Sequence, residues 1–548
     1  MKLKDVKCFK DIYKIFDKKE LEELSADVRK TLNSIANSQG GHIGSSLGVV
    51  ELTIALICFF NVEDSIFLFD TGHQSHVYKL FTNRKDTFNT LLKFNGLSNF
   101  QEMKESEYDW ISNGHSGTSL GYAYAYSLSN SKKNIISIIG DASFYGSYTN
   151  QGLINLINSP HKTITIINDN DQSIGNNYIS IKNMKQYCNS LGFDYIECSD
   201  GHDFTKLFAS IKNANDSEKH VILHIKTAKA KGYDGVKLLD WNHTIKENTD
   251  FSYQKEIANL IEEIFDNNSV LLCPAMLNTS MFDNLKKKWP DNVIDCGINE
   301  ELCALIASGF AKTGKKVYIS IYSTFFQRIF DQLVHDIVRN NLSIVFLIDR
   351  AGLSYSGGVS HHGIYDVGLA KFFNNNIIFH PFTKKDIEDI KFIIKNNENT
   401  KKQIFIRYDK AKLTNINSKL TNYDYIWEEL IFASKNNKTL ITYGTNLQDF
   451  YKLVNEKNLN INLINARFIN PIDKEMLEKH KNNKLYVYEH IIGNNNLYLD
   501  VYKYYKNEKK DIVSFNIKDP LIGHGSKNDV LKEQNLNFEQ ILKIINDD

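Results

Sequence analysis

Short apolar runs rich in β-branched residues recur along the whole chain, separated by segments of helical length. Continuous runs of this kind are typical of strands that are buried on both faces, as in parallel sheets covered by helices. The pattern therefore predicts an α/β protein built from doubly wound sheets. The runs are NIISIIGD, KTITIINDN and HVILHIKT, then KVYISIY, LSIVFLID, IIFHP and QIFIRYD, and finally TLITYG, NINLINARF and KLYVYEH.

Two polar, poorly periodic stretches, near 234–254 and 409–425, interrupt this pattern. With 548 residues, the chain is also longer than a single hydrophobic core supports. We therefore predict three doubly wound α/β domains with mostly parallel sheets, over residues 1–240, 250–412 and 425–548.

The charge balance and the apolar content argue against several kinds of partner. Lys and Arg together number 65, as do Asp and Glu, so no net charge attracts nucleic acid or an anionic membrane. The N-terminus has no apolar signal core, and the longest apolar stretch, 49–60, contains Glu51 and is too short to cross a bilayer. The seven cysteines form no CxxC pair and indicate reduced thiols. We expect a cytoplasmic protein with neither a nucleic-acid nor a membrane partner.

Residues that follow the apolar runs are candidates for a site, because open parallel sheets bind ligands beyond the carboxyl ends of their strands. Asp141 follows one run and Asn170 follows the next. This carboxylate and this amide, with a backbone carbonyl near Gln172, would suit Mg²⁺ bound to a diphosphate. The alternative is that Asp141 caps the following helix and Asn170 forms a turn. Other residues at strand ends are Asn168, Tyr322, Arg350, Arg407 and Arg467.

Glycine-rich phosphate loops are missing from the sequence. No GxGxxG or GxxxxGK[ST] motif follows any of the apolar runs. The usual dinucleotide and P-loop sites are therefore unsupported, whereas a diphosphate held by a metal ion needs no such loop.

The spacing of GD at 140–141 and NDN at 168–170 resembles the thiamine-diphosphate motif of the transketolase superfamily. Further segments resemble one family within it, the 1-deoxy-D-xylulose-5-phosphate synthases. They follow the same order as in that family and span nearly the whole chain. The segments are GGHIGSSLGVVELTIAL, FDTGHQSHVYKLFTNR, ESEYDWISNGHSGTSLG, DCGINEE, YSTFFQRIFDQLVHD, DRAGLSYSGGVSHHG, INARFINPID and HGS.

The resemblance implies a transketolase-like fold and a homodimer. The N-terminal domain would bind the diphosphate of thiamine diphosphate, and the middle domain its aminopyrimidine. The resemblance assigns Asp141, Asn170 and Gln172 to Mg²⁺. The residues of the N-terminal domain that match the family's cofactor-binding positions are His73, His115, Ser116, Gly140 and Lys229.

Glu300 matches the carboxyl group that the family hydrogen-bonds to N1′ of the aminopyrimidine. This role requires a side chain buried enough to keep a proton at neutral pH. Its neighbour Glu301 falls where the family usually has Gln and is the weaker candidate. The alternative for Glu300 is a charge that stabilises a helix N-terminus. Phe325, in YSTFFQR, would stack on the aminopyrimidine.

Histidines at the family's proton-transfer positions complete the predicted catalytic set. Tyr322 and Arg328 would face the group derived from pyruvate, whose carboxylate suits a guanidinium fork. Arg350 and Lys410 match positions that bind the acceptor's phosphate, and His361 would also bind substrate. The matching histidines are His42, His73, His115, His243 and His361.

Two histidine pairs leave a zinc site open as an alternative. His73 and His76 are spaced HxxH, and His361 and His362 are adjacent. No helix pattern and no third ligand accompany either pair, so the sequence favours proton transfer.

Several features depart from the family pattern. Ala142 follows Asp141 where the family has Gly, which matters where the backbone needs φ > 0 or approaches the diphosphate closely. Gly357 stands where the family has an acceptor-binding Asp. Lys410 replaces an Arg and lacks its bidentate fork. The segment 170–229 is also shorter than usual, which indicates a trimmed covering loop. Because Gly357 and Lys410 both concern the acceptor, its identity is less certain than the donor chemistry.

The sequence therefore predicts a transferase that depends on thiamine diphosphate and Mg²⁺. It would decarboxylate pyruvate and join the two-carbon unit to glyceraldehyde 3-phosphate, which feeds isoprenoid and thiamine biosynthesis. One alternative is the same carboligation onto a different aldehyde or sugar. A second is a catalytically degenerate protein that binds thiamine diphosphate as a sensor or assembly partner.

Overall fold

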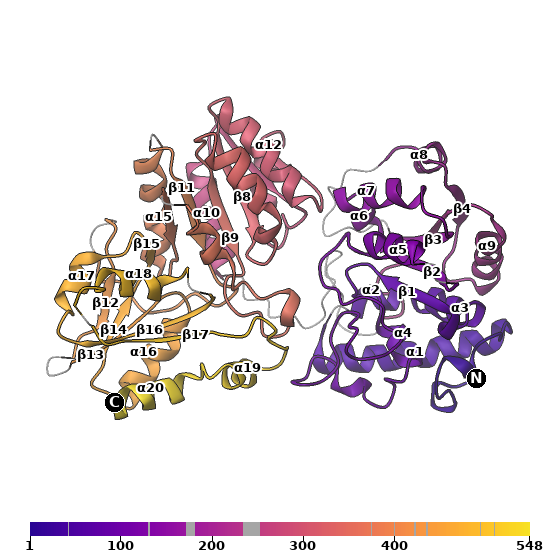
Figure 1. The fold of residues 1–548 in the computed structure, drawn as a ribbon, viewed down its shortest axis with the longest axis horizontal. Coiled ribbons are helices and arrows are strands. Elements are labelled where there is room, and N and C mark those ends of the chain that lie inside the picture. Colours follow the sequence, from indigo (N-terminus) through magenta and orange to yellow (C-terminus); the bar gives the residue numbers. More distant parts are fainter. Residues whose placement is uncertain are drawn as a thin grey trace. The chain divides into compact units, whose positions relative to one another are not determined.

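The described chain forms two compact units (Figure 1). Unit 1 consists of Met1–Asn248 with Gly297–Asn299, and unit 2 of Thr249–Cys296 with Glu300–Asp548. No helix among the described residues has both the length and the apolar character needed to cross a membrane. The computed structural model describes residues 1–41, 43–129, 132–170, 181–233, 252–373, 375–398, 400–420, 424–433, 437–493, 495–508 and 510–548.

Unit 1 contains a five-stranded sheet of order β1-β2-β3-β5-β4, and its neighbouring strands pair in parallel. Because the strands are parallel, their carboxyl ends all lie at one edge of the sheet. The strands are β1 (Ser65–Phe69), β2 (Asn134–Gly140), β3 (Thr163–Asp169), β4 (Asp194–Cys198) and β5 (Val221–Lys226).

Alternate residues of these strands enter two separate apolar clusters, one on each face of the sheet. Ile136 and Ile138 of β2 pack in the cluster of α1, α3 and α9, whereas Ile135 and Ile139 pack in the cluster of α5, α7 and α8. Helices on both faces of a parallel sheet make this unit doubly wound. The helices are α1 (Lys18–Gln39), α2 (Ile43–Gly48), α3 (Val50–Phe59), α4 (His76–Phe81), α5 (Ser119–Leu128), α6 (Asp141–Phe144), α7 (Ser147–Leu156), α8 (Met184–Leu191) and α9 (Phe204–Asp216).

Unit 2 contains a seven-stranded sheet of order β15-β10-β11-β9-β8-β6-β7. Its strands are parallel except β15, which pairs antiparallel with β10 at the edge. The strands are β6 (Ser269–Cys273), β7 (Val293–Asp295), β8 (Lys316–Tyr322), β9 (Val345–Asp349), β10 (Asn376–Phe379), β11 (Gln403–Arg407) and β15 (Phe468–Asn470).

A five-stranded sheet of order β12-β14-β13-β16-β17 follows in the same unit, with β12 antiparallel to β14 and the other pairs parallel. Its strands are β12 (Glu428–Ile431), β13 (Lys438–Thr442), β14 (Asn462–Asn465), β16 (Lys484–Ile492) and β17 (Ile512–Ile517). The helices of unit 2 are α10 (Ser252–Ile264), α11 (Asp283–Lys288), α12 (Glu300–Lys312), α13 (Phe330–Gln332), α14 (Asp366–Ala370), α15 (Lys384–Asn397), α16 (Asn446–Glu456), α17 (Lys474–Lys479), α18 (Leu497–Tyr504), α19 (Lys527–Glu533) and α20 (Phe538–Asp547).

The predicted fold class is confirmed. Every apolar run quoted above contains a strand, and the sheets are mostly parallel. The division into three domains stays a prediction. The first sheet lies within 1–240, but the second and third sheets belong to one unit, and β15, from the range predicted for the C-terminal domain, pairs in the middle sheet.

Candidate active site

Polar residues follow three adjacent strands at the carboxyl edge of the unit 1 sheet. Asp70 follows β1, Asp141 follows β2 and Asn170 follows β3. The register pairs Gly140 with Asn168, so the ends of β2 and β3 lie side by side. The N–H of Asn170 donates to Oδ2 of Asp141 at 3.2 Å. The structure thus brings together the two residues predicted to bind Mg²⁺.

Asp141 is the first residue of α6, and the cap position belongs to Gly140, which makes no side-chain cap. Oδ1 of Asp141 accepts the N–H of Ala142 at 2.7 Å. Burial raises the pKa of the Asp141 carboxyl, and the charge of Asp169 adds to this, whereas the backbone hydrogen bonds and the charge of Lys229 act against it. A buried carboxylate of this kind gains from a nearby cation, and each oxygen still has a lone pair for one. The donor set therefore fits Mg²⁺.

The departure at Ala142 does not disturb this backbone. Ala142 lies within α6 and does not have a positive φ, so the methyl group meets no conformational penalty. A Cβ built on Gly140 would meet only Nε2 of Gln74 within 4 Å, at 3.7 Å.

Asp70 is a residue of this edge that the sequence analysis missed. Its carboxylate accepts the N–H groups of Gly117 at 2.9 Å and Ser119 at 3.1 Å. The hydroxyl of Ser116 bonds that of Thr71 at 2.7 Å. These bonds fix the loop with His115 and Ser116 at the end of β1. The signal was available, since Asp70 follows an apolar run just as Asp141 does.

The loop that carries His73 is held from α2. Oγ of Ser46 bonds the carbonyl oxygen of His73 at 3.0 Å and Nδ1 of His76 at 2.7 Å. His76 is fully buried. Nδ1 of its ring is therefore engaged with Ser46 within the protein.

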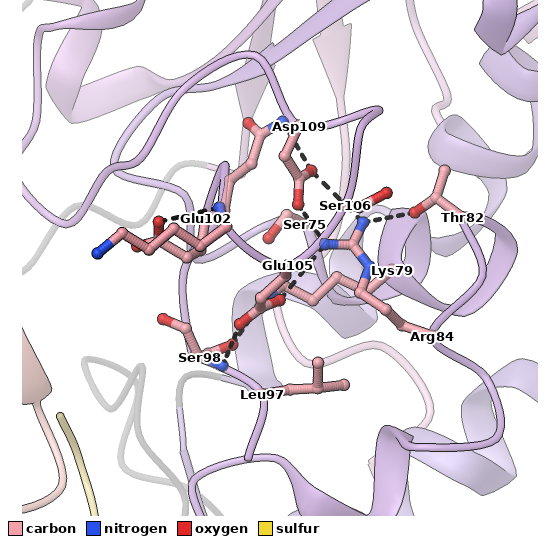
Figure 2. Close-up of polar contacts among 12 residues, drawn as sticks. Ser75, Lys79, Thr82, Arg84, Leu97, Ser98, Glu102, Glu105, Ser106 and Asp109 are labelled. Carbon is pink, nitrogen blue, oxygen red and sulfur yellow. Dashed lines mark hydrogen bonds and ion pairs between the residues drawn. The ribbon is translucent and has the colours of Figure 1, made fainter. Parts of the chain in front are cut away.

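A buried ionic cluster, shown in Figure 2, supports the segment between these two loops. Nζ of Lys79 donates to Glu105 Oε2 at 2.6 Å and to the carbonyl oxygen of Ser98 at 2.7 Å. The Arg84 guanidinium pairs with Asp109 and also reaches Glu105 at 3.4 Å. Lys79, Arg84 and Asp109 are all less than 10% exposed. Buried charges persist only when they are paired in this way.

Gln101 connects this cluster to the loop of His115. Its Nε2 donates to Asp109 Oδ1 at 3.2 Å and to the carbonyl oxygen of Phe67 in β1 at 2.9 Å. The N–H of Asn113 donates to the carbonyl oxygen of Gln101 at 3.0 Å. Through Gln101, the cluster thereby holds against β1 the segment that leads into the loop of His115.

Three predicted site residues, His42, Gln172 and His243, lie outside the described residues. Lys229 lies in the segment after β5, and its charge acts on Asp141. The cofactor residues predicted for unit 1 and described here thus lie at or beyond the carboxyl ends of its strands.

In unit 2, Glu300 is the first residue of α12 and is 3% exposed. Nη1 of Arg328 lies 3.3 Å from its Oε2. Burial raises the pKa of the Glu300 carboxyl, and the charge of Arg328 acts against this. Because burial prevails, Glu300 can carry a proton at a higher pH than an ordinary glutamate.

Aromatic rings and an arginine gather beyond the end of β8. The Tyr322 and Phe325 rings stack with centroids 5.8 Å apart and planes 8° apart. The His361 ring meets Phe325 edge-on at 6.2 Å, and the Arg350 guanidinium lies 4.2 Å from the Tyr322 ring centroid. The Tyr322 hydroxyl bonds Oγ1 of Thr279 at 2.5 Å. The structure therefore brings together four of the residues predicted for substrate and pyrimidine binding.

Asp349, at the end of β9, is a second residue that the sequence analysis missed. Burial raises its pKa to about 6, although Arg350, Gln254 and Lys410 act against this. Nε2 of Gln254 donates to Asp349 Oδ1 at 2.6 Å. Arg350 and Lys410 are the two residues predicted to bind the acceptor's phosphate. Their positive charges thus both act against the rise in the pKa of the buried Asp349 carboxyl.

The position of Gly357 is crowded. A Cβ there would lie 2.5 Å from Cβ of His361 and 2.6 Å from Oγ of Ser354, which is too close without movement. An aspartate like that of the family could not be added unless His361 or Ser354 moved. The adjacent His362 accepts the N–H of Ser354 through Nδ1 and donates to the carbonyl oxygen of Ile522 through Nε2, each at 3.1 Å. Both of its nitrogens are therefore engaged within the protein.

Comparison with known proteins gives consistent matches. Residues 3–187 match the family model of 1-deoxy-D-xylulose-5-phosphate synthase, and residues 249–415 match that of the transketolase pyrimidine binding domain. The 1-deoxy-D-xylulose-5-phosphate synthase of Malacoplasma penetrans is 34% identical over 95% of this chain and 95% of that protein. Those of Clostridium tetani (30% identical, 98% of each chain) and Fusobacterium nucleatum (29% identical, 96% of this chain and 98% of that one) are also similar. At this identity and coverage, the chain belongs to the 1-deoxy-D-xylulose-5-phosphate synthase family.

Proposed function

We propose that this chain decarboxylates pyruvate and joins the two-carbon unit to glyceraldehyde 3-phosphate. The relatives that carry the synthase name match it over nearly its full length. The observation that carries the proposal is Glu300, a buried carboxyl with a raised pKa inside the region that matches the pyrimidine binding domain. A transferase of this family requires such a group, whereas a degenerate binding protein would not need to keep it protonated.

Thiamine diphosphate, when bound, supplies the electron sink that this reaction requires. In this proposal, His73, His115, Ser116 and Lys229 hold its diphosphate, and the backbone at Gly140 lets a phosphate approach the end of β2. Asp141, Asn170 and Gln172 provide oxygen ligands for Mg²⁺. The supporting observations are the contact between Asp141 and Asn170 and the loop fixed by Asp70.

Glu300 would donate a hydrogen bond to N1′ of the aminopyrimidine, and Phe325 would pack against its ring. The raised pKa of Glu300 keeps a proton available for this bond at a higher pH than an exposed glutamate would. Arg328 lies beside Glu300, and its charge acts against this rise in the pKa. Burial and the guanidinium thus act in opposite directions on a group proposed to assist proton transfer.

The remaining predicted residues act on the substrates. Tyr322 and Arg328 orient the carboxylate of pyruvate, which a guanidinium binds through parallel hydrogen bonds. Oγ of Ser360, 2.8 Å from Nδ1 of His361, orients that imidazole for proton transfer. The other histidines proposed to move protons are His42, His115 and His243.

Arg350 and Lys410 bind the phosphate of the acceptor in this proposal. A specific observation supports a second candidate, the same carboligation onto a different aldehyde. An aspartate at Gly357 would require His361 or Ser354 to move, and Lys410 offers a point charge without the arginine fork. The acceptor pocket therefore differs from the family pattern at two of its positions.

We also propose a homodimer in the cytoplasm. Apolar side chains on the paired helices α5 and α7 are exposed in the single chain, among them Tyr122, Leu128, Tyr148 and Ile154. Such patches are typical of association surfaces. All seven cysteines are free thiols, six of them buried, as expected in a reducing compartment.

Incubation with labelled pyruvate, thiamine diphosphate, Mg²⁺ and a panel of aldehydes tests the function. We expect cofactor-dependent release of CO₂ and, with glyceraldehyde 3-phosphate, a product of the mass of 1-deoxy-D-xylulose 5-phosphate. A product formed only with another aldehyde would support the second candidate. Cofactor binding without release of CO₂ would contradict both.

A further inference from the structure

A buried acid on α3 has no part in the function proposed above. Glu51 is 6% exposed, and Arg29 of α1 donates to both of its oxygens, each at 2.6 Å. Nδ1 of His202, in the loop before α9, lies 2.9 Å from Oε2. Burial would raise the pKa of Glu51, but the hydrogen bonds from His202 and Arg29 lower it to about 2. Glu51 is therefore a paired carboxylate at neutral pH.

The contacts of His202 fix its tautomer. Its Nε2 lies 2.9 Å from the backbone nitrogen of Ala228. A backbone N–H can only donate, so Nε2 must accept, and the ring hydrogen must lie on Nδ1. Glu51 accepts this hydrogen and thereby sets the orientation of the imidazole that holds Ala228.

Arg29 holds the same segment at a second point. Its Nε donates to the carbonyl oxygen of Lys231 at 3.1 Å. One turn further along α1, Nδ2 of Asn33 donates to the carbonyl oxygen of Gly232 at 2.9 Å. Ala230, between these contacts, has a φ of 54°, which a residue with a side chain rarely adopts without support. The segment 228–232 is therefore held in shape from outside.

Lys229 lies within this segment, next to the anchored Ala228. On its other side, the N–H of Ala230 donates to the carbonyl oxygen of Gly44 at 2.9 Å. Lys229 follows β5 and Asp141 follows β2, and both strands pair in parallel with β3, so the two residues lie beyond the same carboxyl edge of the sheet. The anchors thus determine where this cation stands relative to the carboxylate proposed to bind Mg²⁺.

We propose that Arg29, Glu51 and His202 are positioning residues that hold the segment 228–232 so that Lys229 meets the diphosphate of the cofactor. The proposal rests on the proposed function, in which Lys229 binds that diphosphate. A lysine acts as a point charge on a flexible stem, so its contribution depends on where its backbone is fixed. None of the three positioning residues needs to touch the cofactor.

A double-mutant cycle with His202→Ala and Lys229→Ala tests whether His202 acts through Lys229. The readout is the Kd for thiamine diphosphate, measured by calorimetry with Mg²⁺ present. We expect His202→Ala to weaken binding about tenfold, as the loss of a supporting contact behind a ligand does. In the Lys229→Ala background the same substitution should change the Kd little. An unchanged Kd, or losses that simply add, would overturn the proposal.

Leu156→Ala is the matched control for lost stability. Leu156 is fully buried, and it lies in the apolar cluster on the face of the sheet opposite α1, α3 and α9. We expect this variant to lower the Tm while leaving the Kd unchanged. If Leu156→Ala weakened cofactor binding as much as His202→Ala does, general destabilisation would explain the higher Kd. The positioning role of His202 would then be contradicted.

Amide hydrogen exchange of the protein without cofactor provides a second test. We expect His202→Ala to accelerate exchange at Ala228, and Arg29→Lys to loosen the segment because lysine cannot donate to both Glu51 and Lys231 as the guanidinium does. Leu156→Ala should not change exchange at Ala228. If the wild-type protein bound no thiamine diphosphate, the proposed function would be contradicted. Because the exchange measurement uses protein without cofactor, it would still decide whether these residues hold the segment 228–232. Unchanged exchange in both anchor variants would overturn the positioning role.

Discussion

At Glu300, burial and a neighbouring positive charge shift the pKa of the carboxyl group in opposite directions. Burial raises its pKa and Arg328 lowers it, with burial prevailing. We predict that Glu300→Gln keeps thiamine diphosphate affinity within a few-fold, because the amide can still donate a hydrogen bond, but lowers kcat by about 10²-fold or more, because the amide cannot exchange a proton. Calorimetry and steady-state kinetics measure the two effects separately.

Glu301→Gln provides the control for this prediction. Glu301 is adjacent in sequence and only half-buried. We expect this variant to keep most of its turnover. Equal losses in the two variants would mean that the carboxyl of Glu300 has no special role.

A substitution of Asp141 tests the proposed Mg²⁺ site. Its carboxylate is buried, and the backbone of Asn170 donates to it at 3.2 Å. We predict that Asp141→Ala weakens thiamine diphosphate binding in saturating Mg²⁺ by about tenfold or more, because an oxygen ligand is lost. Asp194→Ala, on β4 of the same sheet and 41% exposed, is the control. An affinity equal to wild type across a Mg²⁺ titration would refute the ligand role.

At the scale of elements, Glu51 makes the packing of α1 against α3 depend on pH. Its pKa is about 2 in the folded protein, against 4.5 for an ordinary glutamate. Because the pKa is lower in the folded protein, the ionised Glu51 carboxylate stabilises the fold above pH 4.5. This contribution is lost as the pH falls toward 2. The shift corresponds to a contribution on the order of 3 kcal/mol. We predict that Glu51→Gln is less stable than wild type at pH 7 and that the gap narrows below pH 4.5. Urea unfolding at several pH values measures it, and a gap that does not change with pH would contradict the assignment.

The sequence predicted the strands well because the sheets are mostly parallel. Central parallel strands are buried on both faces, so their residues form continuous apolar runs that are visible in one sequence. The edge strands β12 and β15 are short and antiparallel, and no such run marks them. For the same reason the sequence did not show that β15 pairs with β10 in the middle sheet.

Polar and charged residues at strand ends have different roles, although their positions in the sequence are alike. Asp141, Tyr322 and Arg350 lie among other candidate site residues, but Arg407 is buried and pairs with Asp366 at 2.8 Å. Its acidic partner lies far away in the sequence, on α14. Whether a strand-end charge binds a ligand or completes an internal pair depends on partners that only the fold brings close.

At the scale of the whole molecule, Arg467 links the two sheets of unit 2. It follows β14 and is completely buried. Nη1 donates to Asp386 Oδ1 at 2.9 Å and to Asp389 Oδ2 at 2.7 Å, and both acids lie on α15. The carbonyl oxygen of Arg467 accepts the N–H of His380, just after β10, at 2.8 Å. One residue between β14 and β15 thus holds elements of both sheets, in addition to the pairing of β15 with β10.

We predict that Arg467→Met destabilises unit 2 by about 3–5 kcal/mol, because the buried Asp386 loses its ion pair with Arg467 and Asp389 is left with its ion pair to Lys385. The added substitution Asp389→Asn should recover part of this loss, since it removes one of the two carboxylate charges while Asp386 keeps its bonds to the backbone of Phe382 and Thr383. Hydrogen exchange measured by peptide should accelerate together in β11 and β13, one strand from each sheet. If only one sheet responded, the two would unfold separately, and the predicted boundary at 412–425 would mark independent domains after all. A coupled response would instead mean that the middle and C-terminal sheets fold as one cooperative body.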